Sequence, residues 1–277
     1  MTREPVYALD ADALALFARK GSEGGPDIPQ AGLANGVKVR RVLQITRDFA
    51  RRPLSGLRVL DLGCGEGVYA IEAGLRGAEV LAVDARTARM EQGAACATRL
   101  GLRTVCFRQD DVRRVTIDSV GTFDVVYLLG LLYHLDVPDV FAVLENVHGL
   151  CGGMLVIDTL ISLTAESRVE WRGSTYSGRR CREHEDDDTD AVRRSRVLKS
   201  IDNTFSFRFT RDSLLRALQG TGFTSVCECH IPAEPGKAVD RITLVALTGS
   251  PVRLSTYPWV NDKSETEIER ALLPPAS

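Results

Sequence analysis

An acid and three alternating glycines at the end of a short apolar segment are the residues best placed to do chemistry. Residues 59–67 read VLDLGCGEG, and a second apolar segment ends about 20 residues later in Asp84. Glycine lets the backbone turn and approach a ligand more closely than a side chain would allow. An acid that follows the second strand is the residue type that binds a ribose diol in open α/β sheets. The pattern therefore predicts a site for a nucleoside-like ligand.

The spacing of these glycines distinguishes two classes of ligand. A dinucleotide-binding fold requires G-x-G-x-x-G against its pyrophosphate, whereas the glycines here stand at 63, 65 and 67 and Val68 follows them. Asp61, at the end of the first strand, would repel a pyrophosphate but would attract the ammonium group of an amino acid. The spacing therefore disfavours a dehydrogenase.

The segment 59–67, with Asp84 behind it, closely resembles motif I of the class I S-adenosylmethionine-dependent methyltransferases. The segment 130–135, GLLYHL, resembles the family's segment after the fourth strand. The resemblance implies S-adenosyl-L-methionine as the cofactor and assigns residues to each part of it. These are Asp61, Gly63, Cys64 and Gly65 for the methionine part, Asp84 and Ala85 for the ribose, Asp111 with Val112 for the adenine (Asp110 as the fallback), and Leu129 and Gly130 beside the methyl group.

Alternating helices and strands must position these residues. Apolar patterns predict strands at 104–107, 123–129 and 154–158 and helices at 86–100 and 138–148, with Gly152 and Gly153 as a stop before the last strand. This alternation predicts a doubly wound parallel sheet with ligands at the carboxyl ends of its strands. The resemblance adds a C-terminal hairpin, 224–231 and 241–247, which makes a seven-stranded Rossmann-like sheet with one antiparallel C-terminal strand.

The chain divides into five predicted parts. They are an N-terminal helical cap or lid (1–54), the cofactor-binding core (55–159), an insertion after strand five that shapes the acceptor pocket (160–204), a completion of the core sheet (205–248) and a C-terminal tail (249–277) with a short helix at 263–273. Within the first part, residues 21–36 are expected to be loop-like and 37–51 helical. Thr210 is a candidate cap for a helix over 211–219.

Three side chains are candidates for the catalytic step. Methyl transfer is an in-line displacement that requires alignment and, for some acceptors, removal of a proton. His134 is a candidate base because its unperturbed pKa of about 6.5 suits that task; the alternative is that it orients a loop. Tyr133 either faces the acceptor or packs under the lid. Glu170, beside Trp171, is either a carboxylate base or an ordinary exposed acid.

Charged residues gather in the insertion 160–204. His184 and the acids at 185–188 could hold Mg²⁺, although an acidic run is more often a solvated loop. The seven cysteines include one close pair, 227 and 229, without a second pair to complete a zinc site, so no metal site is predicted. Free thiols favour a reducing, cytoplasmic location.

The composition limits the classes of binding partner that the sequence predicts. The net charge of -2 argues against nucleic acid, and neither a signal peptide nor a membrane span is expected. The main interpretation is therefore a methyltransferase with a small-molecule acceptor in specialised metabolism, with a homodimer left open. Alternatives are a tRNA wobble-uridine (carboxy)methyltransferase, which also has a GLLYH-like segment, a Mg²⁺-dependent C-methyltransferase of an isoprenyl diphosphate, and a cofactor-binding regulatory subunit without catalysis.

Overall fold

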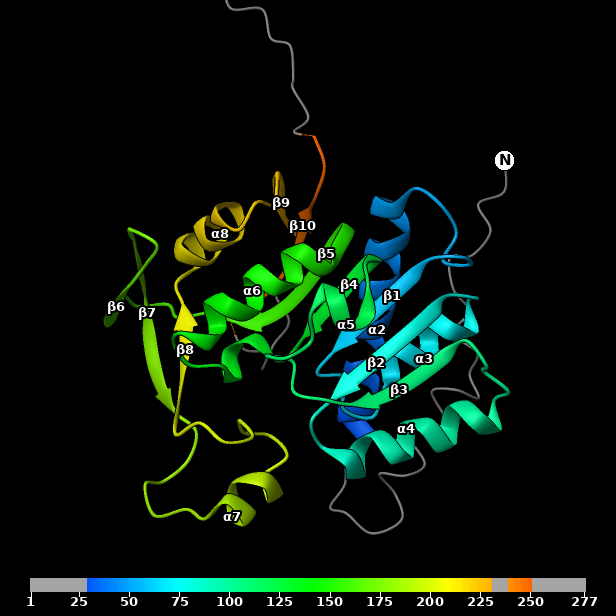
Figure 1. Cartoon of the computed structure of the whole chain (residues 1–277), viewed down its shortest axis with the longest axis horizontal. Helices are drawn as coiled ribbons and strands as arrows, with labels where there is room; N and C mark the ends of the chain where they lie inside the picture. Colours follow the sequence, from blue (N-terminus) through cyan, green and yellow to red (C-terminus); the bar gives the residue numbers. More distant parts are fainter. Residues whose placement is uncertain (1–28, 231–238, 251–277) are drawn as a thin grey trace, which may run out of the picture.

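A seven-stranded sheet forms the centre of the computed structural model, which describes residues 29–230 and 239–250 (Figure 1). Its strands lie in the order β3-β2-β1-β4-β5-β10-β9. All neighbours are parallel except β10, which runs antiparallel to both β5 and β9. The predicted fold class is confirmed. The strands are β1 (Arg58–Leu62), β2 (Glu79–Asp84), β3 (Val105–Gln109), β4 (Phe123–Leu129), β5 (Cys151–Leu160), β9 (Ser225–Glu228) and β10 (Arg241–Leu247).

Helices cover both faces of this sheet. One face packs against α2 (Pro29–Ala50), α3 (Val68–Leu75) and α4 (Thr87–Arg99). The other packs against α5 (Ile117–Val120), α6 (Asp139–Leu150) and α8 (Arg211–Gly220) (Figure 1). None of the described helices is both long and apolar enough to cross a membrane.

Strand β4 explains why both faces are covered. Its apolar residues alternate between two cores: Val125 and Tyr127 belong to the cluster beneath α2 and α3, and Val126 and Leu128 to the cluster beneath α6. A central parallel strand is buried on both sides and therefore shows a continuous apolar run in sequence. The hydroxyl groups of Thr46 and Tyr127 are 2.8 Å apart and hydrogen-bond α2 to the sheet.

A second sheet of three antiparallel strands lies beyond α6, to the left in Figure 1. It consists of β6 (Ser167–Trp171), β7 (Ser174–Arg182) and β8 (Phe205–Phe209), with the short helix α7 (Asp190–Ser195) between β7 and β8. One prediction is corrected here. The segment 205–209 belongs to this second sheet and does not complete the core sheet, and the insertion 160–204 contributes the β6–β7 hairpin.

Aromatic packing explains the position of β8. Phe207 and Phe209 are buried and meet edge to face at 5.1 Å, and Phe209 meets Phe141 of α6 at 5.2 Å. On β6, Trp171 stacks on the same Phe141 ring at 5.2 Å. These rings fix the second sheet, including β8, against α6.

Three local predictions also need correction. Helix α2 begins at Pro29, inside the segment 21–36 that was expected to be loop-like, and proline is well suited to a first helical turn. Gly152 and Gly153 lie within β5 rather than before it; a Cβ at Gly153 would come within 2.5 Å of the Asp124 carbonyl oxygen. The Thr210 hydroxyl donates to the Ser177 carbonyl oxygen at 3.2 Å instead of capping α8.

Helix α2 is a layer of the core. Val39, Val42 and Leu43 are almost fully buried against the sheet, so the described part of the expected N-terminal cap covers a sheet face. Residues 1–28 of that cap, residues 231–238 and the tail from 251, including the helix expected at 263–273, lie outside the described residues.

Candidate cofactor and acceptor site

The loop after β1 is held open by its glycines and by Asp84. Gly63 and Gly65 have φ angles of +73° and +56°, a backbone conformation that glycine adopts without strain. The Gly65 N–H donates to one Asp84 carboxylate oxygen at 2.8 Å, and the Arg86 N–H donates to the other at 2.8 Å. The acid at the end of β2 therefore positions the loop at the end of β1, and both lie at the carboxyl edge of the sheet.

Asp61 is a buried acid with an unsatisfied oxygen. Its side chain is on β1 with 1% exposure, and Oδ2 has no hydrogen-bond partner among the described residues. Burial and the charge of Asp84 raise the pKa of Asp61 to about 7, against the opposing hydrogen bond of the Ala70 N–H in the first turn of α3. Such an acid is favourable beside a cation and costly without one.

Asp111, the acid expected to bind the adenine, lies after β3, where Arg113 binds its side chain. The Arg113 guanidinium donates to Asp111 through Nε at 2.9 Å and through Nη2 at 2.6 Å. Burial acts to raise the pKa of Asp111, but the hydrogen bonds and charge of Arg113 lower it below its usual value. Asp110, the fallback, accepts from the Asp111 N–H at 2.9 Å and from Arg108 at 2.6 Å.

One pocket brings five of the eleven expected cofactor residues together with the expected base His134. Among the expected residues it contains Gly63, Asp84, Ala85, Asp111, Val112 and His134. It also contains residues that the sequence did not single out: Arg86, Arg113, Leu131, Leu135, Ile201, Asp202 and Asn203. Cys64 and Leu129 lie behind this lining, where burial raises the pKa of the Cys64 thiol and Leu129 packs against the core beneath α2 and α3.

A carboxylate orients the histidine of the pocket. His134 Nδ1 is 3.1 Å from Oε2 of Glu183, whose side chain is 3% exposed. Glu183 also accepts from the Ser206 hydroxyl at 2.8 Å and the Ser200 N–H at 3.0 Å. Burial would raise the pKa of Glu183, but these hydrogen bonds and the charge of His134 lower it to about 2. An ionised carboxylate only accepts, so Nδ1 carries the proton and Nε2 is free to accept one.

The segment 196–203, called the cover here, borders the pocket on the side of the insertion through Ile201, Asp202 and Asn203. The Arg86 guanidinium donates to the carbonyl oxygens of Lys199 at 2.8 Å and Ser200 at 3.0 Å. Arg113, which holds Asp111, also donates to Asp202 at 2.6 Å. The pocket wall and its cover are thus joined by two arginines that themselves line the pocket.

Tyr133 lies between two arginines at the end of β4. The guanidinium carbons of Arg208 and Arg241 are 5.7 and 5.9 Å from the centre of its ring, and the His134 ring is 4.3 Å away. A Cβ at Gly130 would come within 3.8 Å of the Tyr133 hydroxyl oxygen and 3.6 Å of Arg241. The region expected to hold the methyl group is therefore bordered by Tyr133 and Arg241.

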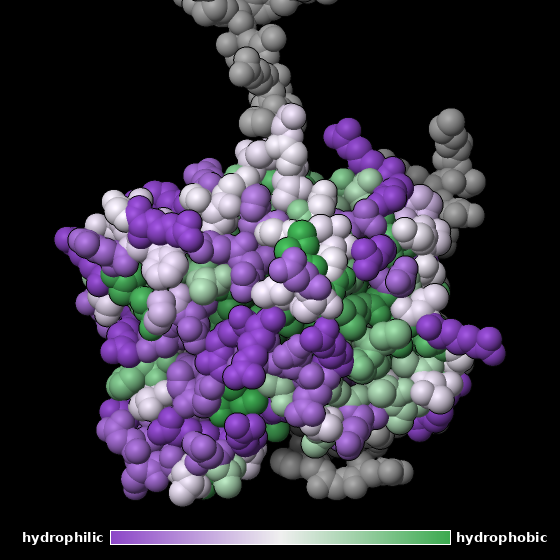
Figure 2. Space-filling model, in the orientation of Figure 1, coloured by the Kyte–Doolittle hydropathy of each residue, from purple (hydrophilic) through white to green (hydrophobic). Residues whose placement is uncertain are grey.

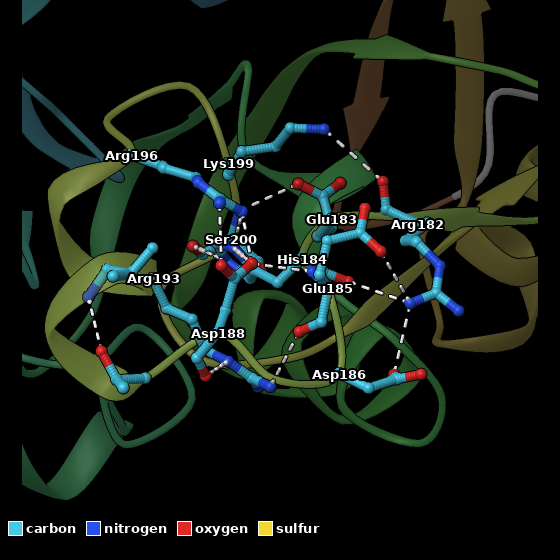
Figure 3. A network of polar contacts seen from close by, with 12 residues as sticks. Arg182, Glu183, His184, Glu185, Asp186, Asp188, Arg193, Arg196, Lys199 and Ser200 are labelled. Carbon is cyan, nitrogen blue, oxygen red and sulfur yellow. Dashed lines mark hydrogen bonds and ion pairs between the residues drawn. The ribbon is translucent and has the colours of Figure 1, made fainter.

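The remaining candidates do not join the site. Glu170 lies exposed on the edge strand β6 and does not line the pocket, which gives no support to a catalytic role. His184 Nε2 is 2.9 Å from the Ser200 carbonyl oxygen, and Asp188 accepts from Arg196, which leaves them engaged within the insertion (Figure 3). The described part of the chain holds no cluster of three or more His, Cys, Asp or Glu that could bind a metal ion.

Hydrophilic residues cover the lower left of the molecule, where α7 and the charged runs of the insertion lie (Figure 2). Glu183 lies in this charged region, and the sequence did not predict its role because nothing in the segment distinguishes a buried acid from the exposed ones. Asp158 has a sequence signal comparable to that of Asp84, since it too follows an apolar run; it lies near the end of β5 and pairs with Arg241.

Fold and pocket together define a Rossmann-like domain with a nucleoside-type site at the carboxyl ends of its parallel strands. Residues 59–152 match the family model described as "Methyltransferase domain". A ubiquinone biosynthesis O-methyltransferase of Azotobacter vinelandii is 36% identical over 109 residues, which cover 39% of this chain and 46% of that protein. One of Methylocella silvestris is 35% identical over 146 residues, covering 46% and 55%. The chain spans about half the length of the curated relatives it matches.

Solved structures share the fold at low identity. The N-terminal domain of EvdMO1, crystallised in the presence of SAH and D-fucose, has a TM-score of 0.64 at 17% identity, covering 89% of this chain and 100% of that one. Magnesium protoporphyrin IX methyltransferase from Synechocystis PCC 6803, with bound SAM, has a TM-score of 0.56 at 14% identity, covering 88% and 100%. Residues 59–152 are thus similar to a methyltransferase domain, and the chain shares its fold with solved methyltransferase structures.

Proposed function

We propose that the protein transfers a methyl group from S-adenosyl-L-methionine to an oxygen atom of a small-molecule acceptor. The observation that carries the proposal is the buried Asp61 carboxyl group, whose Oδ2 has no hydrogen-bond partner in the part of the chain that the structure describes. A cationic ammonium group beside it would supply the missing hydrogen bond and remove the cost of the buried charge. A dinucleotide pyrophosphate there would raise that cost.

The residues of the pocket fit this cofactor. We propose that Asp61, Gly63 and Gly65 hold the methionine part, that Asp84 and Ala85 hold the ribose, and that Val112 with Asp111 holds the adenine. When bound, the cofactor supplies an electrophilic methyl group on its sulfonium. Leu129 and Gly130 are the proposed neighbours of that methyl group. The relatives named as O-methyltransferases support oxygen as the atom that is methylated.

His134 is the proposed general base. Because Glu183 binds Nδ1–H, the imidazole presents Nε2 as the atom that takes the proton of an acceptor hydroxyl group. Glu183 remains ionised, so it stabilises the imidazolium that forms. The Tyr133 ring, 4.3 Å from the imidazole, is a wall of the same site. A base held in this way removes the proton while the sheet fixes the alignment that the displacement needs.

Three of the five predicted parts of the chain acquire proposed roles from this arrangement. The segment 55–159 holds the cofactor, and the insertion 160–204 contributes the cover 196–203 and the orienting acid Glu183. The β8 segment of 205–248 adds Ser206 and Arg208 beside Tyr133. The acceptor would then lie between the end of β4 and the second sheet.

Calorimetric titration with S-adenosylhomocysteine, followed by a transfer assay with a labelled methyl group, tests the proposal. We expect one binding site and label transfer to a phenolic or alcoholic hydroxyl. His134→Gln should retain the binding and lose transfer by about 10²–10⁴-fold. Binding without transfer to any hydroxylated acceptor would instead support a regulatory cofactor-binding subunit.

A further inference from the structure

We propose that the acceptor carries a carboxylate, which Arg208 binds beside the His134–Glu183 pair. This inference rests on the proposed function, since it concerns the acceptor side of the same site. It names the chemical class of the acceptor, which neither the cofactor residues nor the fold specify.

The direction of Arg208 follows from the alternation of β8. Phe207 and Phe209 are 1% and 2% exposed and face the aromatic core against α6. Ser206 and Arg208 therefore share the opposite face, because successive side chains of a strand alternate. The Ser206 hydroxyl donates to Glu183 at 2.8 Å, so this face borders the Glu183–His134 pair. Arg208 then lies over the Tyr133 ring, on the acceptor side.

Arg208 has no anion of its own. Its neighbour across the Tyr133 ring, Arg241, is neutralised by Asp158, which accepts from Arg241 Nε at 2.5 Å. Within the ranges 29–230 and 239–250 Arg208 forms no ion pair, its guanidinium lies over the Tyr133 ring, and its Nε atom is buried without a hydrogen-bond partner. Burying an unpaired polar atom costs free energy that a ligand can recover. A guanidinium in this position is suited to an anionic group of the acceptor. Arg208 is thus left with a surplus of positive charge that no ion pair among the described residues balances, and a neutral acceptor would leave that surplus unmatched.

A carboxylate is the group that fits this surplus. The planar guanidinium binds a carboxylate through two parallel hydrogen bonds, which gives both energy and orientation. Fixing the anionic end of the acceptor against Arg208 would hold a hydroxyl elsewhere on the acceptor near His134 and the methyl group. Acceptors that lack the anion would bind more weakly, because they would leave the Arg208 guanidinium unpaired.

Two matched probes test the proposal on the full chain loaded with S-adenosylhomocysteine. The probes are 3,4-dihydroxybenzoate and 3,4-dihydroxybenzamide, which have the same shape and differ in charge. We expect calorimetry to show about tenfold or tighter binding of the benzoate. Arg208→Met, which keeps the apolar stem over Tyr133, should remove that difference and leave the benzamide unchanged. Arg208→Lys, which keeps a positive charge, should retain part of it.

The control is Arg179→Met. Arg179 lies opposite Arg208 on β7, is exposed and pairs with Glu166 at 3.3 Å. This control should bind both probes like the parent protein. Equal affinity for the two probes, undetectable binding of both, or an Arg208→Met protein that still prefers the benzoate would overturn the proposal. Failure to bind S-adenosylhomocysteine would instead refute the proposed function, so the two failures are distinguishable.

Discussion

The charge state of Asp61 provides a prediction that can be followed from structure to assay. The acid is 1% exposed, and burial and the charge of Asp84 raise its pKa to about 7. The ionised form is therefore disfavoured in the free protein, although it is the form that would bind the ammonium group of the cofactor. We predict that Asp61→Asn, which keeps the shape and removes the charge, stabilises the free protein at pH 8 and weakens cofactor binding.

The size of the effect on stability follows from the pKa. A shift from 3.8 to about 7 corresponds to ~4 kcal/mol, because one pKa unit is about 1.4 kcal/mol. The folded-state pKa lies above the unfolded one, so the favourable contribution is complete below pH 3.8 and is lost as the pH rises through 7. In urea unfolding at pH 8, Asp61→Asn should raise the free energy of unfolding by roughly 2–4 kcal/mol. The difference should shrink toward pH 4.

Folding favours the neutral form of Asp61, whereas cofactor binding should favour its ionised form. An ammonium group beside Asp61 lowers its pKa in the complex, so binding at pH 6 releases a proton and affinity increases toward pH 8. At pH 8 Asp61→Asn should bind S-adenosylhomocysteine at least about tenfold more weakly, since a hydrogen bond to a charged group contributes roughly 1.5–3 kcal/mol. Calorimetry in two buffers of different ionisation enthalpy measures both the affinity and the released proton.

The control for this prediction is Asp118→Asn, at an exposed acid in α5. It should change neither the stability profile nor the affinity. The reasoning is refuted if Asp61→Asn binds as tightly as the parent protein, or if the two proteins show the same dependence of affinity on pH between 6 and 8.

Further variants test the cover, the base and the packing. Glu183→Gln should lower the free energy of unfolding at pH 7 by roughly 3 kcal/mol. The folded-state pKa of Glu183 is depressed to about 2, so urea unfolding should show this difference fading as the pH falls from 4.5 toward 2. Asp202→Asn removes an ion pair of Arg113, so stopped-flow displacement should show S-adenosylhomocysteine dissociating several-fold faster. Gly93→Ala should lower the melting temperature although alanine favours helices by about 1 kcal/mol, because the added Cβ would come within 2.4 Å of the Glu66 carbonyl oxygen.

The central sheet was predictable because the apolar pattern of each segment agrees with the position of its strand in the sheet. The segment 123–129 is apolar except for Asp124, and only a strand buried on both faces needs that composition. The acid Asp84 at the end of its strand and the glycines before α3 have spacings that follow from the geometry of a strand, a loop and a helix. For the same reason, the sequence places Gly63, Asp84, Asp111 and His134 at one edge of the sheet, where the pocket lies.

The acceptor side was not predictable, because its residues meet through long-range contacts. Glu183 reaches His134 across 49 positions, and Arg241 reaches Asp158 across 83. The position of β8 in the second sheet depends on the aromatic rings of α6 and β6, and no sequence pattern links those rings to β8. Glu170 shows the converse: an acid beside a tryptophan resembles a catalytic carboxylate, yet the strand places it on an exposed edge.

Titration of the parent protein with S-adenosylhomocysteine and, separately, with NAD⁺ tests the central claim most directly. If the loop after β1 is shaped for an amino-acid nucleoside with a cationic end, the calorimeter will record one site for S-adenosylhomocysteine and no binding of NAD⁺. Tight binding of NAD⁺, or no heat with S-adenosylhomocysteine at pH 8, would contradict it.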